Sequence, residues 1–325
     1  ALPVGNGTNL ICRDGGVRGA IVCLRDLKDL RIDRGAGERS PVSGTHPDTA
    51  VASVPRTRES GDPEGASGVV RRGEDAGAQG PAGSGGPARE GRHEEREPAG
   101  GAGGDVPGRH ANDVPGRRAV AVTAGAGVAL QELVALGIRE SLTGAEFLAG
   151  IPGSVGGAVR MNAGAYGREL ADILDAVLWL SPAGELRETP REGLNCSYRC
   201  TELPPGAVVA AARFALHAGE AEAVRRAVVE TLTQRRMKHP LALRNAGSIF
   251  KNPRPTPAGR LIEAAGLKGL QVGQAKVSEM HANFIVNLGG ATAADILALI
   301  DLVRTRVRAH TGIDLDPEVH IIGTN

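Results

Sequence analysis

The stretch EFLAGIPGSVGGAVRMNAGAYG, residues 146–167, is the part of the sequence around which we expect the fold to be organised. Six of its 22 residues are glycine, and bulky side chains such as Phe147, Ile151 and Met161 stand between them, so it is not of low complexity. Glycine permits positive φ and a close approach of the backbone to a ligand. Successive N–H groups in such a loop can bind a phosphate or an electron-rich ring. The alternative is a tight structural turn, the more frequent explanation for an isolated glycine pattern.

Length and composition limit the class of protein. A chain of 325 residues is long enough for two domains, or three. Its 38 basic and 37 acidic side chains leave a formal net charge of +1, so no global field favours nucleic acid or a membrane surface. Aromatic residues are too scarce for a platform that stacks single-stranded nucleic acid. No apolar run approaches the ~18 residues of a transmembrane helix, and the N-terminus has no signal-peptide pattern.

The cysteines and histidines form neither a metal-binding nor a disulfide pattern. Cys12, Cys23, Cys196 and Cys200 include no CxxC pair, and the eight histidines include no HExxH motif. We therefore expect no structural zinc site. Free cysteines without a pattern suit the reducing cytoplasm better than a disulfide framework. Because the chain begins at Ala1 rather than at methionine, we also expect it to be incomplete.

Residues 34–118 differ in composition from the rest of the chain. They lack Leu, Ile, Met, Phe, Tyr, Trp, Cys and Lys, and consist mainly of small, proline and charged residues. Such a segment buries too little apolar surface to offset the entropy of ordering its backbone. We interpret it as a disordered, low-complexity insertion and assign no chemistry to it.

Hydrophobic patterns outside that segment predict regular secondary structure. The first 33 residues read as short strands separated by glycine turns, and GNGTN is not followed by a helix, which disfavours a Rossmann fold. In the remainder we predict helices and strands by periodicity, with strands over residues 119–123, 174–180, 185–188, 208–216, 272–277 and 283–287 and helices over 128–138, 220–236 and 258–265. A last helix is predicted to begin after Thr292, with Asp295 as the acid of a capping box. Its buried stripe would be Ile296, Ile300, Val303 and Val307.

Several blocks of sequence follow one another in a characteristic order: GNGTNLICRDGGVRGAIV, EFLAGIPGSVGGAVRMNAGAYG, SYRCT, NAGSIFKNP, GLKGLQVGQAKVSEMHANFIVN and DPEVHIIG. Together they closely resemble the UDP-N-acetylenolpyruvoylglucosamine reductases, also called UDP-N-acetylmuramate dehydrogenases. The resemblance covers residues 1–33 and 119–323. The short distance between SYRCT and NAGSIFKNP is similar to the subtype that lacks an extra tyrosine-bearing loop.

The resemblance implies an α+β fold with two domains. These are an FAD-binding domain of the vanillyl-alcohol-oxidase/PCMH type, N-terminally truncated here, and a C-terminal α/β substrate-binding domain. We accordingly expect residues 1–33 to be a remnant of the N-terminal FAD-binding subdomain and residues 34–118 to be the insertion. Residues 119–217 would form an FAD-binding subdomain. Residues 218–325 would form a substrate-binding domain whose last strand returns to the active site.

The resemblance also implies the reaction. NADPH would reduce a bound FAD, and the flavin would pass hydride to UDP-N-acetylglucosamine enolpyruvate to give UDP-N-acetylmuramate for peptidoglycan synthesis. No histidine or cysteine lies in the glycine motifs, which favours noncovalent FAD. We expect a cytoplasmic monomer involved in cell-wall biogenesis, cell shape and division, with no nucleic-acid or membrane partner. The alternative is a truncated, inactive remnant that still binds the nucleotide sugar.

Three residues match the family's catalytic positions. Ser248 in AGS matches the proton donor, Arg199 after Tyr198 matches the catalytic arginine, and Glu318 in PEV matches the near-terminal glutamate. A permanently charged arginine suits a carboxylate and a developing enolate, and Glu318 would orient it or assist protonation. Taken alone, these residues would be a turn-capping serine, a surface arginine and an acid at a strand edge.

The binding residues follow from the same motifs. FAD would be held by Gly5, Asn6, Gly7, Thr8, Asn9, Ile151, Pro152, Gly153, Ser154, Gly156, Gly157, Asn162, Ala163 and Gly164. The substrate side would comprise Tyr198, Arg235, Lys238, Lys251, Asn252, Lys268 and His281, because a diphosphate and a carboxylate need cations. Arg235 and Lys238 could equally be cations at a helix end. Thr201 and His320 depart from the serine and arginine common in the family.

Overall fold

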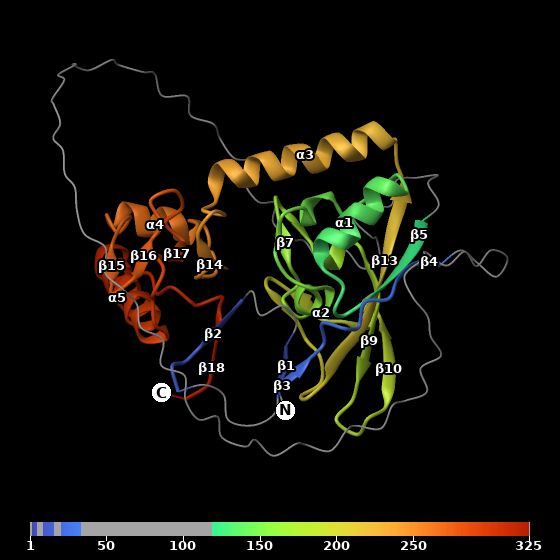
Figure 1. The fold of residues 1–325 in the computed structure, drawn as a ribbon, viewed down its shortest axis with the longest axis horizontal. Coiled ribbons are helices and arrows are strands. Elements are labelled where there is room, and N and C mark those ends of the chain that lie inside the picture. Colours follow the sequence, from blue (N-terminus) through green and yellow to red (C-terminus); the bar gives the residue numbers. More distant parts are fainter. Residues whose placement is uncertain (1, 5–8, 16–20, 34–118, 325) are drawn as a thin grey trace, which may run out of the picture. The chain divides into compact units, whose positions relative to one another are not determined.

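The computed structural model describes residues 2–4, 9–15, 21–33 and 119–324, drawn in colour in Figure 1. The expected insertion at 34–118 and most of the first glycine loop, residues 5–8, lie outside the described residues. Two compact units divide the chain, and all described residues belong to the unit formed by Ala1–Val42 and Gly104–Asn325. Within the described part, no helix is long and apolar enough to cross a bilayer.

A six-stranded antiparallel sheet forms the larger hydrophobic core of this unit. Its order is β10-β9-β13-β5-β4, and β6 also pairs with β13. The strands are β4 (Leu30–Asp33), β5 (Ala119–Gly125), β6 (Leu142–Thr143), β9 (Leu174–Leu180), β10 (Leu186–Pro190) and β13 (Val208–Ala218). Along β13, Ala212, Phe214 and Leu216 are buried at every second position, which places one face of the sheet toward the core. The predicted strands in this region are therefore confirmed, and β4 and the short β6 are additional ones.

Three helices pack with this sheet: α1 (Leu130–Arg139), α2 (Val155–Arg160) and α3 (Ala221–Lys238). α2 contacts β13 and β5, whereas α3 packs on α1 and on the short helix η1 (Glu146–Leu148). Figure 1 shows α1 and α3 side by side. Leu133, Leu136 and Leu148 from α1 and η1 are fully buried in the core that they share with β13. The predicted helices at 128–138 and 220–236 are confirmed.

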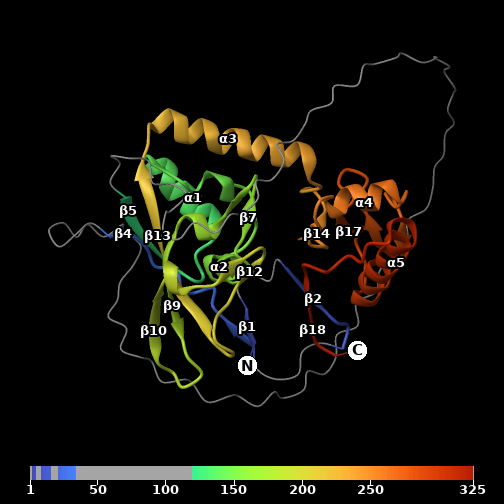
Figure 2. The same ribbon diagram turned by 180° about the vertical axis from the view of Figure 1, so that it is seen from behind.

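A second core lies in the C-terminal part of the chain, which Figure 2 shows from behind. Its sheet has the order β14-β17-β16-β15, formed by Arg244–Ser248, Phe284–Asn287, Ala275–Val277 and Gln271–Val272. Helix α5 (Ala293–Thr311) packs on β15 and β16, and α4 (Ala258–Ala264) packs on α5. The predicted capping box of Thr292 and Asp295 is present at the start of α5.

The prediction of a single strand over residues 272–277 is wrong. The segment folds into a hairpin, in which Gln271 pairs with Lys276 and Val272 pairs with Ala275. Gly273 has φ +53°, a conformation that reverses the chain easily only at glycine. The apolar residues on both sides of the turn look like one strand in the sequence, because alternation does not reveal where a chain reverses.

The N-terminal residues contact both cores. β2 (Leu10–Cys12) pairs in parallel with β18 (His320–Ile322), and β1 (Leu2–Val4) pairs in parallel with β3 (Ile21–Cys23). The carboxylate of Asp14 accepts hydrogen bonds from the backbone N–H groups of Ala293 and Ala294, at 2.8 and 3.0 Å. An acid at this place stabilises the positive end of the α5 dipole.

The stretch at residues 146–167 is more regular than the glycine loop that we expected. Its centre forms α2, in which Val155 and Val159 are buried one turn apart. The N–H groups of Val155 and Gly156 donate to the carbonyls of Val128 and Ala126, so the helix starts against the backbone of the preceding turn. A Cβ at position 156 would lie 2.8 Å from Cβ of Ala126, so that glycine is required by packing.

We expect Gly156→Ala to lower the free energy of unfolding by about 1–3 kcal/mol, because the added methyl group overpacks the contact with Ala126. Gly157→Ala is the matched control, since its Cβ would meet nothing closer than 3.9 Å. Alanine is also the better helix former, so this control should be neutral or stabilised by up to about 1 kcal/mol. Urea unfolding of both variants measures the difference. Equal stabilities would contradict the packing argument.

Candidate functional site

Arg199 and Glu318 form an ion pair between segments that are distant in sequence. Arg199 lies at the turn of a hairpin formed by β11 (Cys196–Ser197) and β12 (Cys200–Thr201). Its Nε donates to Oε1 of Glu318 at 2.8 Å, and the two side chains are only 18% and 14% exposed. Burial raises the pKa of Glu318, whereas the charges of Arg199 and Lys251 oppose that rise. The pair is thus a largely dehydrated cation held against a carboxylate.

The backbone of Arg199 is strained. Its φ is +58°, in the left-handed region that side chains other than glycine rarely adopt. Such a conformation costs about 1–2 kcal/mol per residue and persists only where the surroundings enforce it. An arginine at a position that would suit glycine, with its side chain held against Glu318, indicates that contacts outside the turn fix the direction of the guanidinium.

Arg199→Gly is expected to be more stable than Arg199→Ala by about 1 kcal/mol, because glycine adopts the positive φ without a steric penalty. Both variants lose the same ion pair with Glu318, so the difference between their free energies of unfolding measures the cost of the positive φ at this position. Chemical denaturation of the two proteins measures it. If alanine were as stable as glycine, the turn would not be strained.

Ser248 is brought to this ion pair by backbone pairing. It ends β14 and is half-buried. The next residue, Ile249, accepts a hydrogen bond at 2.7 Å from the N–H of Glu318, and Phe250 and Pro317 form a β-bridge. The hairpin, the end of β14 and the segment before β18, which carry the three residues that match the family's catalytic positions, are therefore joined by the Arg199–Glu318 ion pair and the Glu318–Ile249 hydrogen bond.

Three of the seven residues expected on the substrate side, Tyr198, Lys251 and Asn252, flank this trio. The guanidinium of Arg199 lies 4.9 Å from the centroid of the Tyr198 ring, and the Tyr198 hydroxyl accepts from the N–H of Asn252 at 3.4 Å. Nζ of Lys251 donates to Asp316 at 2.7 Å, two residues before Glu318. That hydrogen bond is the main cause that raises the pKa of Lys251. The amide oxygen of Asn252 accepts from the N–H of Ala258 at 3.1 Å.

His281 packs in an aromatic cluster with His239 and Phe284, whose ring centroids lie 4.9–5.3 Å apart. Burial lowers the pKa of both imidazoles, to about 4 for His239, so both are neutral near pH 7. The charge of Lys268 also lowers the pKa of His281, and Lys268 pairs with Glu263 at 2.5 Å. Sequence reasoning missed His239, whose only signal was its place directly after the basic end of α3.

Arg235 and Lys238, which both lie in the last turn of α3, differ in environment. Arg235 is buried, whereas Lys238 is exposed. Burial lowers the pKa of Arg235, and its Nε has no hydrogen-bond partner among the described residues. Its guanidinium lies 5.7 Å from the centroid of the Tyr166 ring, which our prediction did not include. A Cβ at Gly150 would lie 2.8 Å from the Arg235 side chain, so that glycine makes room for it.

The second glycine motif, residues 151–164, offers only part of the expected contacts to a cofactor. The hydroxyl of Ser154 is buried and has no hydrogen-bond partner in the described part of the chain, which fits a polar ligand group at this place. Gly157 is exposed. By contrast, the N–H groups of Val155 and Gly156 already donate to protein carbonyls, and Gly164 lies too close to the Arg168 carbonyl for any Cβ.

Of the first glycine motif, only Asn9 lies within the described residues. Its amide Nδ2 donates to the carbonyl of Glu318 at 3.0 Å, and its own carbonyl accepts from the N–H of His320 at 3.0 Å. His320 in turn places Nε2 3.2 Å from Sδ of Met161, in the second glycine motif. Asn9, Met161 of the second glycine motif and the segment that carries Glu318 thus meet.

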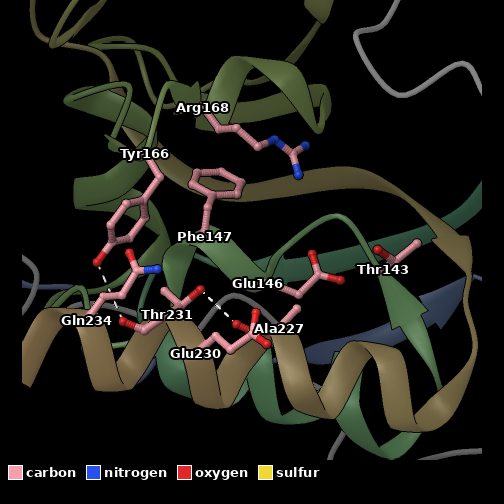
Figure 3. A pocket seen from close by; sticks show the side chains of 9 residues that line it. All are labelled: Thr143, Glu146, Phe147, Tyr166, Arg168, Ala227, Glu230, Thr231 and Gln234. Carbon is pink, nitrogen blue, oxygen red and sulfur yellow. Dashed lines mark hydrogen bonds between the residues drawn. The ribbon is translucent and has the colours of Figure 1, made fainter. Parts of the chain in front are cut away.

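A separate hollow of about 400 Å³ lies between α3 and the segments around η1 and β7 (Gly164–Ala165). Figure 3 shows it with Phe147 under the guanidinium of Arg168, and with the Tyr166 hydroxyl directed to the carbonyl of Thr231 at 3.5 Å. None of the residues that we predicted to be catalytic or ligand-binding lines it. Through Tyr166, this hollow adjoins the buried Arg235.

Comparison with known proteins links both parts of the chain to one family. The model of the C-terminal domain of UDP-N-acetylenolpyruvoylglucosamine reductase matches residues 239–322, and an FAD-binding domain model matches residues 115–190. The UDP-N-acetylenolpyruvoylglucosamine reductase of Syntrophus aciditrophicus is 41% identical over 322 residues, which cover 99% of this chain and 78% of that protein. The protein of that name from Geotalea uraniireducens is 47% identical over 202 residues, 62% of this chain and 67% of its own.

A solved structure gives the same result. The crystal structure of UDP-N-acetylenolpyruvylglucosamine reductase from Thermus caldophilus matches with a TM-score of 0.57 and 41% sequence identity. The match covers 62% of this chain and 72% of the Thermus chain. The expected combination of an FAD-binding domain and the C-terminal domain of this family is thereby confirmed.

Proposed function

Because the chain belongs to the UDP-N-acetylenolpyruvoylglucosamine reductases, we propose that Arg199, Ser248 and Glu318 complete the reduction of the enolpyruvyl group that this family carries out. The enzyme is an FAD-dependent oxidoreductase of peptidoglycan precursor synthesis. The observation that supports the roles of the three residues is the Arg199–Glu318 ion pair, whose backbone pairs with the strand end carrying Ser248.

The chemistry explains why these side chains are needed. FAD, held against the second glycine motif, would supply hydride that originates from NADPH for addition to the terminal carbon of the enolpyruvyl group. That transfer leaves negative charge on the neighbouring carbon and its carboxylate, and the carbon must then gain a proton. Arg199 stabilises the charge, because a dehydrated guanidinium interacts more strongly than one in water. Ser248 donates the proton; a hydroxyl is a weak acid, so it acts only against a strongly basic carbon.

Glu318 acts on the arginine. The carboxylate fixes the orientation of Arg199 through the 2.8 Å hydrogen bond to Nε and leaves the outer guanidinium nitrogens for the substrate. Its own backbone is held by Asn9 on one side and by Ile249 on the other. In this arrangement Glu318 must be ionised to hold the guanidinium.

The substrate-side candidates bind the nucleotide sugar, and the glycine motifs face the cofactor. Lys251 and Lys268 engage the diphosphate by exchanging their partners Asp316 and Glu263 for phosphate oxygens, and Arg235 supplies a buried positive charge. Tyr198, Asn252, Lys238 and His281 complete the substrate side. On the cofactor side, the Ser154 hydroxyl, which has no hydrogen-bond partner among the described residues, supports the placement of FAD against the second glycine motif.

The same proposal extends to organisation and location. Residues 119–217, together with 1–33, bind FAD, and residues 218–325 bind the nucleotide sugar. The enzyme works as a monomer in the cytoplasm, where its NADPH and nucleotide-sugar substrates are made, and it serves cell-wall growth, cell shape and division.

Anaerobic rapid mixing tests this function. The purified chain, supplied with FAD, is expected to lose its flavin absorbance on mixing with NADPH and to regain it with UDP-N-acetylglucosamine enolpyruvate. A flavin that is reduced but not reoxidised by that substrate would overturn the proposed substrate. A colourless protein that still binds the UDP-sugar would instead establish the inactive remnant.

A further inference from the structure

Asn162 is a buried polar residue whose side chain is used entirely within the protein. It is 1% exposed and has φ +40°. Its Nδ2 donates to Oε2 of Glu169 at 2.7 Å and to the carbonyl of Ser197 at 3.0 Å, while Oδ1 accepts from the N–H of Ala171 at 3.0 Å. A side-chain amide with three protein partners has little left to offer a cofactor.

One of these partners belongs to the hairpin that carries Arg199. Ser197 is the last residue of β11, two positions before the arginine. The other strand is held from the same side, because Nη1 of Arg160 donates to the carbonyl of Thr201 at 2.5 Å. Arg160 ends α2, and Asn162 follows it by two residues. The end of the second glycine motif therefore forms hydrogen bonds with both strands of the hairpin.

These two hydrogen bonds stabilise the strained turn at Arg199. Arg199 has a strained positive φ, which persists only where neighbouring contacts over-determine the turn. The hairpin itself is short, with two paired residues in each strand, so its own hydrogen bonds cannot hold the turn rigidly. External hydrogen bonds at Ser197 and Thr201 supply that rigidity on the two flanks of the arginine.

We propose that Asn162 and Arg160 are positioning residues, which clamp the Arg199 hairpin against Glu318, and that Asn162 does not bind FAD through its side chain. The proposal rests on the proposed function, because it assigns to the clamp the orientation of an arginine that acts in the second half-reaction. It also links the two sites, since the segment that approaches the cofactor is the segment that holds the arginine.

The residue type at position 162 follows from its partners. Two acceptors and one donor surround the side chain, which requires a group that donates twice and accepts once, as the amide of asparagine does. Aspartate in its place would set a second carboxylate against that of Glu169 and against the Ser197 carbonyl. Leucine would leave all three partners without hydrogen bonds in a buried site.

The test compares Asn162→Ala and Arg160→Ala with the wild type, each reconstituted with FAD. We expect NADPH to reduce the flavin at the wild-type rate in both variants, because that step does not use the hairpin. Reoxidation by the enolpyruvyl nucleotide should slow by about 100-fold in Asn162→Ala, the size of effect expected when a catalytic group is misplaced by about 1 Å. Arg160 lies nearer the surface, so Arg160→Ala is the variant that retains the fold if the buried substitution does not.

A pH profile separates positioning from general loss of structure. Glu318 faces two cations, Arg199 and Lys251, and both hold its pKa down against burial. If Arg199 is no longer clamped, the pKa of Glu318 rises further, and the acid limb of the reoxidation rate moves to higher pH. Asn287→Ala is the matched control, because it removes an asparagine that accepts three backbone hydrogen bonds in the C-terminal part. Its acid limb should stay in place.

Each outcome decides between explanations. A slower reoxidation with a shifted acid limb in either clamp variant supports the proposal. Loss of FAD with normal rates on the FAD that remains would identify Asn162 as a cofactor ligand, and slower rates without a shift would make it merely structural; both overturn the proposal. If the wild type itself failed to be reoxidised by the enolpyruvyl nucleotide, the proposed function would be wrong, and that failure is seen before any variant is made.

Discussion

Replacing Ser248 by alanine is expected to slow the reoxidation of reduced flavin by the enolpyruvyl nucleotide by about 10²–10⁴-fold, the usual contribution of a positioned general acid. The reduction of FAD by NADPH should keep its wild-type rate, because that half-reaction adds no proton to a substrate carbon. Ser248 is half-buried at the end of β14, beside the backbone that pairs with Glu318. Rapid mixing of each half-reaction separately measures both rates.

A second variant shows whether acidity is what matters at this position. Ser248→Cys replaces the hydroxyl by a thiol of similar size and lower pKa, so it should recover part of the rate lost in Ser248→Ala. Solvent deuterium should slow the reoxidation of the wild type and leave that of Ser248→Ala less affected. A variant that lost both half-reactions equally would show that Ser248 does not donate the proton.

Glu318→Gln is expected to remove the acid limb of the pH profile of reoxidation and to lower the plateau rate by about 10²–10³-fold. In the wild type, burial raises the pKa of Glu318 above its ordinary value of 4.5. The carboxylate that holds Arg199 is therefore lost as the pH falls through that raised pKa. Glutamine does not titrate, so the dependence disappears, and it holds a guanidinium more weakly than a carboxylate does.

Asp316→Asn provides the matched control for this profile. Asp316 lies two residues before Glu318 and pairs with Lys251 rather than with Arg199. Its neutralisation should change the affinity for the substrate diphosphate but leave the acid limb where it is in the wild type. An acid limb that survived in Glu318→Gln would show that another group controls the protonation-dependent step.

Local sequence signals predicted those elements whose stability is decided within a few residues. The capping box at the start of α5 needs only Thr292 and Asp295, three positions apart, and it forms as predicted. The strand over residues 174–180 was predicted with the bounds that β9 has, because a short, mostly apolar run that ends at a Ser-Pro turn is visible in the sequence. The helix α2 was missed, because its two central glycines are poor helix formers and its stability comes from packing against Ala126.

The chemistry of the candidate site was also accessible from the sequence. The order of the motifs identified the family, and with it the serine, arginine and glutamate that we propose for the reaction. The resemblance also implied that Glu318 orients Arg199, and the two side chains do form an ion pair, but it did not show which other side chains pack beside them. Tyr166 and His239 escaped prediction, because a single aromatic residue becomes part of a site only through the side chains that pack beside it.

The sequence by itself determined the residue types, their order and the short-range elements of this protein, since helix caps, alternation and glycine content depend on neighbours along the chain. Only the tertiary structure decided that Arg199 meets Glu318 across 119 residues, that Arg235 is buried while Lys238 is exposed, and that Asn162 turns its amide to the hairpin. The physical reason is that burial and pairing depend on which distant segments come to cover a side chain. Closing those long loops is opposed by entropy and is repaid only when the whole core forms.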